Sequence, residues 1–204
     1  NIIDIKEKNI KIESDWSSAS YFFSAVALSK FSDLKLSFFS TDSMQGDSEL
    51  VKLYKKLGVV SKIKNGNLLL SKNSKFQKPN FINLNLNDTP DLAQTIAVTC
   101  LGLKINCELN GLHTLKIKET DRLLALKNEI SKFGASVKIT NDSLHLIAKK
   151  NLKHDVEIDT YNDHRMAMAF APLALKNNLK IKNEQVVTKS YPAFWKDLQS
   201  IGFQ

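Results

Sequence analysis

Hydrophobic and polar positions along the chain follow an order of elements that recurs. Residues 17–30 form a mostly apolar stretch long enough for a buried helix, and residues 34–39 form a short apolar run typical of a strand. Three amphipathic stretches end in glycine, at Gly58, Gly134 and Gly202, where a left-handed residue commonly caps a helix. Because these glycines recur about every 70 residues, the pattern predicts an internal repeat of one supersecondary unit.

Three units of this repeat are predicted, over about residues 9–75, 80–150 and 155–204. Each unit has a strand, a helix, a second strand and a second helix, and the first two units close with a β-hairpin. The predicted strands are 9–14, 34–39, 81–86, 105–109, 156–159 and 179–182. The predicted helices are 17–30, 47–57, 91–102, 119–133, 163–175 and 193–201, and the hairpins turn at 65–67 and near 141–142. The fold class is therefore α/β (α+β), a single domain of repeated βαβαββ units.

The third unit is predicted to be incomplete, because the chain stops before a closing hairpin. A sheet without its last strands exposes an edge and apolar surface. We expect the complete protein to supply those strands from residues upstream of Asn1, which is not a start methionine. Parallel βαβ crossovers also place helix starts near the carboxyl ends of strands, and grouped helix starts form an anion-binding face.

The chain is rich in positive charge, and lysine supplies almost all of it. It has 204 residues and a formal net charge of +8, which favours anionic partners such as nucleic acid, an acidic membrane surface or phosphorylated metabolites. Of 29 basic residues, only Arg122 and Arg165 are arginines. A guanidinium can bind phosphate or carboxylate through two parallel hydrogen bonds. These two arginines are therefore candidates for anion recognition.

Several other classes of protein lack support in the sequence. No apolar run approaches the roughly 20 residues of a membrane-spanning helix, and the first residues show no secretory signal. Cys100 and Cys107 have no metal-ligand spacing, which predicts buried free thiols in a reducing compartment. The chain has no glycine-rich phosphate loop and no zinc motif. Its lysines are scattered without the aromatic interleaving of a nucleic-acid platform.

Four polar clusters fall at or near predicted helix starts, and the first two lack arginine. Asp15 or Ser17 is expected to cap the first helix. Asp88 and Asp91 flank Pro90, and proline in a first turn initiates a helix. Two carboxylates beside one helix start exceed what capping requires, so one of them is a candidate general base.

The other two clusters contain the arginines. Lys118-Glu119-Thr120-Asp121-Arg122 opens a predicted helix, where acidic residues suit the helix dipole but two cations oppose it. The spacing of four predicts that both cations lie on one helical face. Arg165 lies in the first turn of another apolar helix, beside Asp163 and His164. The residues by themselves therefore predict an α/β domain that binds a small, multiply anionic ligand.

These clusters are also where the chain resembles the 5-enolpyruvylshikimate-3-phosphate synthase family. The matching stretches occur in the family's order and cover nearly the whole chain: 15–21, 43–47, 90–91, 118–122, 161–168 and 189–192. Lys-Glu-Thr-Asp-Arg at 118–122, followed by Asn-Asp-His-Arg-Met-Ala-Met at 162–168, is a specific pair of motifs.

The resemblance implies a fold and a reaction. The family has two globular domains joined by a hinge, each an inverse α/β barrel of three βαβαββ units, and this chain resembles the domain that contains the carboxyl terminus. A short segment from the extreme amino terminus completes that domain, which agrees with the missing hairpin. The implied reaction belongs to the shikimate pathway of aromatic amino acid biosynthesis. It transfers the enolpyruvyl group of phosphoenolpyruvate to the 5-hydroxyl of shikimate 3-phosphate and releases phosphate through a tetrahedral ketal, without a metal or other cofactor.

The same resemblance implies roles for individual residues. Asp91 would accept the hydroxyl proton, Glu119 would protonate the methylene carbon of phosphoenolpyruvate, and His164 would support this proton chemistry. The residues implied to bind phosphoenolpyruvate are Arg122, Arg165 and Lys189. Those implied to bind shikimate 3-phosphate are Asp91, Thr114 and Lys118.

The family's other half supplies substrate-binding residues that have no counterpart in this chain, including a Ser-Ser-Gln group for the phosphate of shikimate 3-phosphate. We therefore expect the chain to be inactive alone and to need the missing amino-terminal half. The full enzyme is expected to be a cytoplasmic monomer that binds neither nucleic acid nor membrane. Three alternatives stay open: the related transferase that acts on UDP-N-acetylglucosamine, a non-catalytic module that binds RNA or another polyanion, and a free-standing fragment with a purely structural role.

Overall fold

The computed structural model describes residues 12–30 and 32–203. The first unit packs two helices against an antiparallel sheet. Its sheet has the strand order β1-β3-β2, formed by β1 (Asp33–Ser37), β3 (Asn67–Lys72) and β2 (Val59–Lys64). Its helices are α1 (Trp16–Leu28) and α2 (Leu50–Lys55), the latter preceded by a 3-10 turn, η1 (Gly46–Glu49). Because α1 carries apolar or small side chains on all sides, it is buried along almost its entire length.

The second unit repeats this order with a complete four-stranded sheet, β4-β5-β7-β6. β4 pairs parallel with β5, and β5, β7 and β6 pair antiparallel. The strands are β4 (Phe81–Asn85), β5 (Asn106–Asn110), β6 (Ser136–Ile139) and β7 (Leu144–Ile147). The helices are η2 (Pro90–Leu92), α3 (Ala93–Leu103), η3 (His113–Ile117) and α4 (Arg122–Lys132).

The third unit has a sheet of two parallel strands within the part of the chain that the structure describes, together with four helices of the same described part. Its strands are β8 (Val156–Ile158) and β9 (Leu179–Ile181). Its helices are α5 (His164–Phe170), η4 (Ala171–Leu175), η5 (Glu184–Lys189) and α6 (Phe194–Ser200). The predicted mixed α/β fold is therefore confirmed, and the second unit shows the full βαβαββ order. Within the described residues the first unit lacks its predicted first strand and the third has no closing hairpin, so the division into three repeats stays a prediction.

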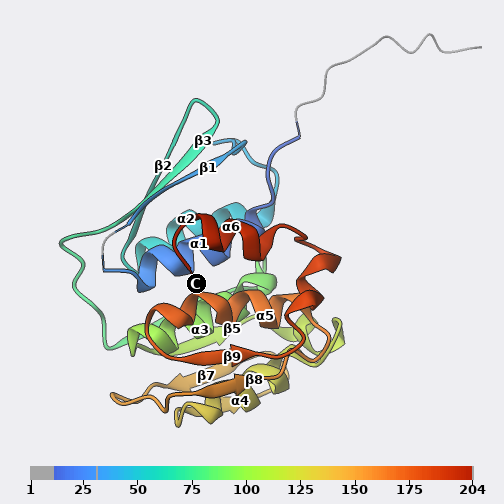
Figure 1. Cartoon of the computed structure of the whole chain (residues 1–204). Helices are drawn as coiled ribbons and strands as arrows, with labels where there is room; N and C mark the ends of the chain where they lie inside the picture. Colours follow the sequence, from blue (N-terminus) through green and yellow to red (C-terminus); the bar gives the residue numbers. More distant parts are fainter. Residues whose placement is uncertain (1–11, 31, 204) are drawn as a thin grey trace, which may run out of the picture.

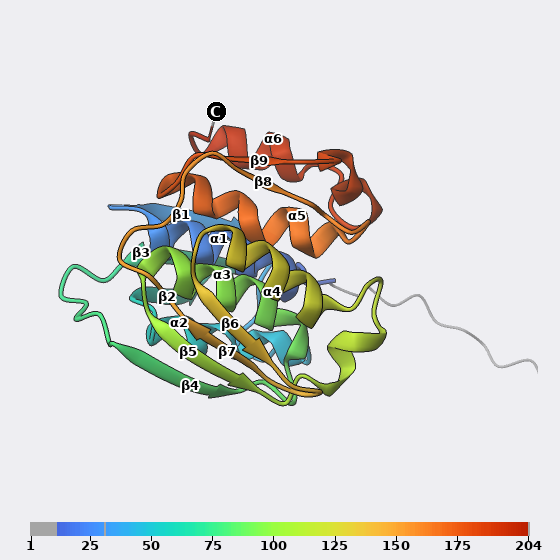
Figure 2. The ribbon, with the colours of Figure 1, turned by 90° about the horizontal axis from the view of Figure 1, so that it is seen from below.

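The helices α1, α3 and α5 occupy the middle of the molecule, and the sheets lie around them (Figures 1 and 2). Strands such as β4 alternate exposed and buried residues, as expected of a sheet with one wet face. The central helices approach closely at Gly102 of α3, where an added Cβ would lie 2.6 Å from Leu28 and 2.9 Å from Leu173. This packing brings the starts of helices from different units toward one end of the molecule.

Several predicted elements differ from the observed ones at their ends. The predicted helix 163–175 divides into α5 and η4, and the predicted helices 47–57 and 91–102 begin as 3-10 turns. Of the predicted strand 9–14, residues 9–11 lie outside the described residues, and 12–14 have no strand structure. The short helices η3 and η5 were not predicted. Neither carries the long apolar periodicity by which helices are recognised in a sequence.

The turn chemistry follows the sequence closely. The three glycines at the predicted helix ends all have positive φ, at Gly58, Gly134 and Gly202. The first hairpin turns at Asn65 and Gly66, both left-handed. The cysteines at 100 and 107 are buried and free, as predicted. In the described ranges, none of the helices combines the length and the apolar character needed to traverse a bilayer.

Candidate functional site

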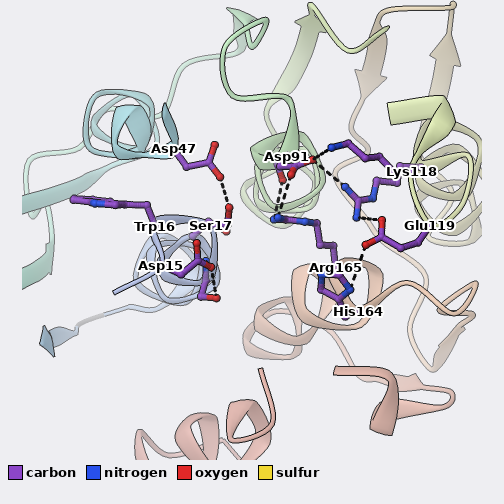
Figure 3. A network of polar contacts seen from close by, with 12 residues as sticks. Asp15, Trp16, Ser17, Asp47, Asp91, Lys118, Glu119, His164 and Arg165 are labelled. Atoms are coloured by element: carbon purple, nitrogen blue, oxygen red, sulfur yellow. Dashed lines mark hydrogen bonds and ion pairs between the residues drawn. The ribbon is translucent and has the colours of Figure 1, made fainter. Parts of the chain in front are cut away.

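The candidate site lies where the starts of α3, α4 and α5 meet, and it contains both arginines of the chain. Figure 3 shows the side chains of Asp91, Lys118, Glu119 and Arg165 pointing toward one another. Asp91 comes from η2, directly ahead of α3. Arg122 is the first residue of α4, and Arg165 is the second residue of α5. Residues from two repeats thus share one location, although they are as many as 74 positions apart in the sequence.

Arg122 is the centre of this cluster, with a side chain only 1% exposed. Its Nε donates to Oδ2 of Asp163 at 2.6 Å, its Nη1 to Oδ1 of Asp91 at 2.9 Å, and its Nη2 to Oε2 of Glu119 at 2.5 Å. All three guanidinium nitrogens are therefore bonded to carboxylates. The residue ties α4 to η2 and to the start of α5.

Asp91 is shared among three cations. Its Oδ1 accepts from Arg122 and lies 3.5 Å from Nζ of Lys118, and its Oδ2 accepts from Nη2 of Arg165 at 3.2 Å. Its carboxylate is 26% exposed, so solvent or a ligand can reach it. This arrangement places a potential base among groups that attract anionic ligands.

Lys118 contacts Asp91 from an extended segment and not from the predicted helix. The prediction placed Lys118 and Arg122 on one helical face, but α4 begins only at Arg122, so that prediction is wrong. Asp121 caps the helix by accepting from the backbone N of Leu124 at 3.0 Å. Lys118 precedes the cap in an extended conformation after η3. Both cations still converge on one carboxylate.

Asp163 is fully buried and serves two elements. It caps α5 by accepting from the backbone N of Arg165 at 2.8 Å, and it also accepts from Arg122. The two residues before it, Tyr161 and Asn162, are both left-handed at φ +54. Conformations of this kind are uncommon for residues other than glycine and gather at functional sites.

His164 lies beside Glu119, with 3.7 Å between Nδ1 and Oε1. Burial lowers the pKa of His164, and the neighbouring Asp163 carboxylate only partly opposes this effect. The imidazole is therefore mainly neutral at pH 7. Its Nδ1 is buried and has no hydrogen-bond partner among the described residues.

A metal ion at Glu119, Asp163 and His164 would compete with the guanidinium of Arg122 for the two carboxylates. Glu119, Asp163 and His164 each offer a ligand atom within 4.8 Å of the others. Both carboxylates, however, already bind the guanidinium of Arg122. A cation entering this cluster would have to displace a fully charged side chain from them. The donor set therefore fits an ion-pair network better than a metal centre.

Two residues of the predicted site lie outside this cluster of contacts. Lys189, in η5, donates from Nζ to the backbone O of Asn162 at 3.0 Å. It thus contacts the turn before α5 rather than a carboxylate. Thr114, in η3, has a buried hydroxyl oxygen without a hydrogen-bond partner in the described part of the chain.

A second polar group lies at the start of α1, on the other side of the view in Figure 3. Asp15, one of the two caps that the sequence allowed, caps α1 by accepting from the backbone N of Ser18 at 2.8 Å. Ser17 donates to Asp47, and burial raises the pKa of Asp47. Asp47 and Asp163 were not among the predicted site residues. For Asp163, its N-cap position directly before His164 and Arg165 was the available signal.

Comparison with solved structures defines the class of protein first. The chain superimposes on EPSP synthase from Acinetobacter baumannii with a TM-score of 0.74, 20% identity, and coverage of 93% of this chain and 46% of that one. It also matches the enolpyruvyl transferase NikO from Streptomyces tendae, with a TM-score of 0.65, 11% identity, and coverage of 94% and 43%. The chain therefore has the enolpyruvyl transferase fold.

Sequence comparison then narrows this class to one family. Residues 4–198 match the family described as EPSP synthase (3-phosphoshikimate 1-carboxyvinyltransferase), and the chain belongs to that family. It is 42% identical over 195 residues to 3-phosphoshikimate 1-carboxyvinyltransferase from Bacteroides fragilis, covering 94% of this chain and 47% of the relative. It is 34% identical over 198 residues to the protein of that name from Buchnera aphidicola subsp. Cinara cedri, with coverage of 97% and 44%. The chain spans about half the length of these relatives.

Proposed function

We propose that this chain supplies one half of an enzyme that transfers the enolpyruvyl group of phosphoenolpyruvate to the 5-hydroxyl of shikimate 3-phosphate and releases phosphate. The observation that carries the proposal is the convergence of Lys118, Arg122 and Arg165 on the carboxylate of Asp91, with Glu119 bonded to the same arginine. Membership of the EPSP synthase family supports the choice of reaction.

Anion binding requires Arg122 to exchange a partner, because all three of its nitrogens are already bonded. Asp163 is fully buried, whereas Asp91 is 26% exposed and Glu119 is 40% exposed. The phosphate or carboxylate of phosphoenolpyruvate would therefore displace Asp91 or Glu119 and leave the bond to Asp163 intact. Arg165 and Lys189 would complete the anion site.

The displaced carboxylates have roles in this proposal. Asp91 would take the proton from the attacking hydroxyl of shikimate 3-phosphate, and Glu119 would protonate the methylene carbon of phosphoenolpyruvate. Protonation of that carbon develops positive charge, which a nearby carboxylate stabilises. His164, next to Glu119, would exchange protons with it between turnovers. Lys118 and Thr114 would hold shikimate 3-phosphate.

The remaining strands of the third sheet would come from the rest of the enzyme. β9 has one edge without a strand in the described ranges. Beside it lies a pocket of about 310 Å³ lined mainly by apolar side chains, including Leu179, Ile181, Trp195, Leu198 and Phe203. In the second unit, the corresponding strand β5 pairs with the hairpin β6–β7. We propose that residues 1–204 form one domain of three repeats, that a hairpin from elsewhere in the enzyme covers β9, and that a second domain completes a cytoplasmic monomer.

A chimaera tests the proposed reaction directly. The 204 residues would replace the aligned segment of the Bacteroides fragilis relative, to which they are 42% identical. We expect the chimaera to release phosphate from phosphoenolpyruvate only when shikimate 3-phosphate is present, and the chain alone to show no turnover. The same chimaera with Asp91→Asn should turn over at least about 100-fold more slowly.

Three outcomes would contradict the proposal. One is a chimaera that unfolds cooperatively yet releases no phosphate with both substrates. Another is activity with UDP-N-acetylglucosamine in place of shikimate 3-phosphate. The third is tight retention of generic RNA by the chain in filter binding, with a steep dependence on salt, which would indicate a polyanion-binding module.

A further inference from the structure

Glu129 is a carboxylate on α4 that is completely shielded from solvent. Its Oε1 accepts a hydrogen bond from the hydroxyl of Tyr161 at 2.8 Å. Its Oε2 accepts from the backbone N of Asp159 at 3.0 Å and lies 2.6 Å from Nζ of Lys132. Apart from Lys132, one turn further along α4, these partners belong to the segment that joins β8 to α5.

That segment, residues 159–163, is the β8–α5 turn, and it needs support. Tyr161 and Asn162 are both left-handed at φ +54. Each such residue costs on the order of 1–3 kcal/mol, and the conformation persists only where surrounding contacts hold it. The turn leads directly into Asp163, His164 and Arg165. A change in the turn would therefore move all three of these side chains together.

Side chains on one face of α4 form hydrogen bonds to both ends of the β8–α5 turn. Arg122 and Glu129 are seven residues apart, which places them on the same side of an α-helix. Arg122 bonds to Asp163 at the end of the turn, and Glu129 bonds to Asp159 and Tyr161 at its start and middle. The helix that carries one arginine of the site thus also orients the segment that carries the other.

A purely structural role explains this carboxylate poorly. Glu129 is paired with Lys132 and hydrogen-bonded, but even a well-paired buried ion often stabilises a core no better than packed apolar residues do. The buried residues on either side, Leu126 and Ile130, show that this part of α4 accepts apolar side chains. What a carboxylate adds is two acceptor atoms, and both are used on the β8–α5 turn.

We propose that Glu129 is a positioning residue of the site. It holds the β8–α5 turn in its left-handed conformation, so that His164 faces Glu119 and Arg165 faces Asp91. It is not expected to touch either substrate. The kinetic consequence rests on the proposed function, but the placement of His164 does not depend on it.

The test uses two variants and a matched control. Glu129→Gln removes the charge, and Tyr161→Phe removes only the hydroxyl that bonds to it. Tyr54→Phe is the control, since it also removes a buried hydroxyl bond, to Thr99 at 2.9 Å, but lies away from the turn. The free energy of unfolding of each variant is measured by urea denaturation. The titration of the His164 imidazole is followed by NMR in the 204-residue chain.

We expect both turn variants to raise the titration midpoint of His164 toward that of an exposed histidine, because a loosened turn admits water to the imidazole. Tyr54→Phe should lower stability comparably and leave that midpoint unchanged. In the chimaera, both turn variants should lower kcat about tenfold to a hundredfold, as expected for misplaced catalytic groups. Tyr54→Phe should keep kcat within about twofold of the parent.

The proposal is overturned if the turn variants lose stability but match Tyr54→Phe in the His164 midpoint and in kcat. If Glu129→Gln does not fold, the same comparison with Tyr54→Phe, in the His164 midpoint and in kcat, is made with Tyr161→Phe alone. If the unmodified chimaera is inactive, the proposed function fails, and the His164 midpoint alone tests the positioning role.

Discussion

The side chains of Arg122 and Asp163 face each other inside the protein, with 2.6 Å between Nε and Oδ2 and almost no exposure of either residue. The pair joins the start of α4 to the start of α5 across 41 positions of sequence. Asp163 also accepts from the backbone of Arg165, so a single carboxylate orients both arginines. Arg122 therefore contributes to the fold as well as to the proposed anion site.

Replacing Arg122 should unfold the chain more readily. Arg122→Met leaves Asp163 buried without its cation, which should lower the free energy of unfolding by about 3–5 kcal/mol. Urea denaturation measures this change. The control is Lys52→Met, which breaks the exposed pair with Glu49 and should cost less than about 1 kcal/mol. Equal losses in the two variants would argue against a structural role for the buried pair.

Removing the negative charge of Asp91 should strengthen the binding of an anion but slow turnover. In Asp91→Asn the cations around this position lose a competing carboxylate, so the chain should bind phosphoenolpyruvate about two- to fivefold more tightly in calorimetry. Turnover of the chimaera should nevertheless fall, because the proposed base is gone. The matched control is Asp88→Asn, at an exposed neighbouring position. Weaker binding in Asp91→Asn would count against the proposed exchange of partners.

The lowered pKa of His164 predicts a pH dependence of stability. Burial favours the neutral imidazole in the folded chain, so between the lowered pKa and about 6.5 the unfolded chain binds more protons. The free energy of unfolding should therefore fall as the pH drops through this window. Above about pH 6.5, the titration of His164 should not change it. His164→Gln should show a shallower fall between pH 7 and pH 5 than the parent. The free energies of unfolding of the parent and of His164→Gln are compared at each pH, with their difference at pH 8 as the reference. A difference that stays constant down to pH 5 would contradict a lowered pKa of His164.

Gly111 should tolerate no side chain. It has φ +78 between β5 and η3, and an added Cβ would lie 2.5 Å from the backbone N of Asn87. Gly111→Ala should therefore cost about 1–3 kcal/mol for the backbone conformation and more for the clash. Gly202→Ala is the matched control, because Gly202 has φ +103 and, among the described residues other than its chain neighbours, no heavy atom lies within 4 Å of the added Cβ. If thermal or urea denaturation finds equal costs, the contact with Asn87 does not constrain the loop.

Much of the architecture was predictable because local chemistry determines it. The mostly apolar stretch at residues 17–28 favours a buried helix, and Asn65-Gly66 favours a tight hairpin turn. Glycines with positive φ end the helices where the pattern placed them. The rarity of arginine also directed attention to positions 122 and 165, whose guanidinium groups meet at one carboxylate.

The ends of elements and the hydrogen-bond partners were less predictable. The spacing of Lys118 and Arg122 predicts a shared helical face, yet the helix begins only after Asp121, which caps it. A spacing of four shows a shared face only where the helix actually extends over both residues. The N-cap position of Asp163 could have indicated it, but nothing in the local pattern distinguishes Glu129 from other acidic residues on helices, because its partners Asp159 and Tyr161 lie in another part of the chain.

The sequence by itself determined most of the order of helices and strands, the first hairpin turn and the family, because each of these depends on neighbouring residues or on motifs. Only the tertiary structure decided which charges meet. Asp91 contacts Arg122 and Arg165 across 31 and 74 positions, and Glu129 reaches Tyr161 across 32. Contacts of this kind depend on how the repeats pack around α1, α3 and α5, and no local periodicity encodes that packing.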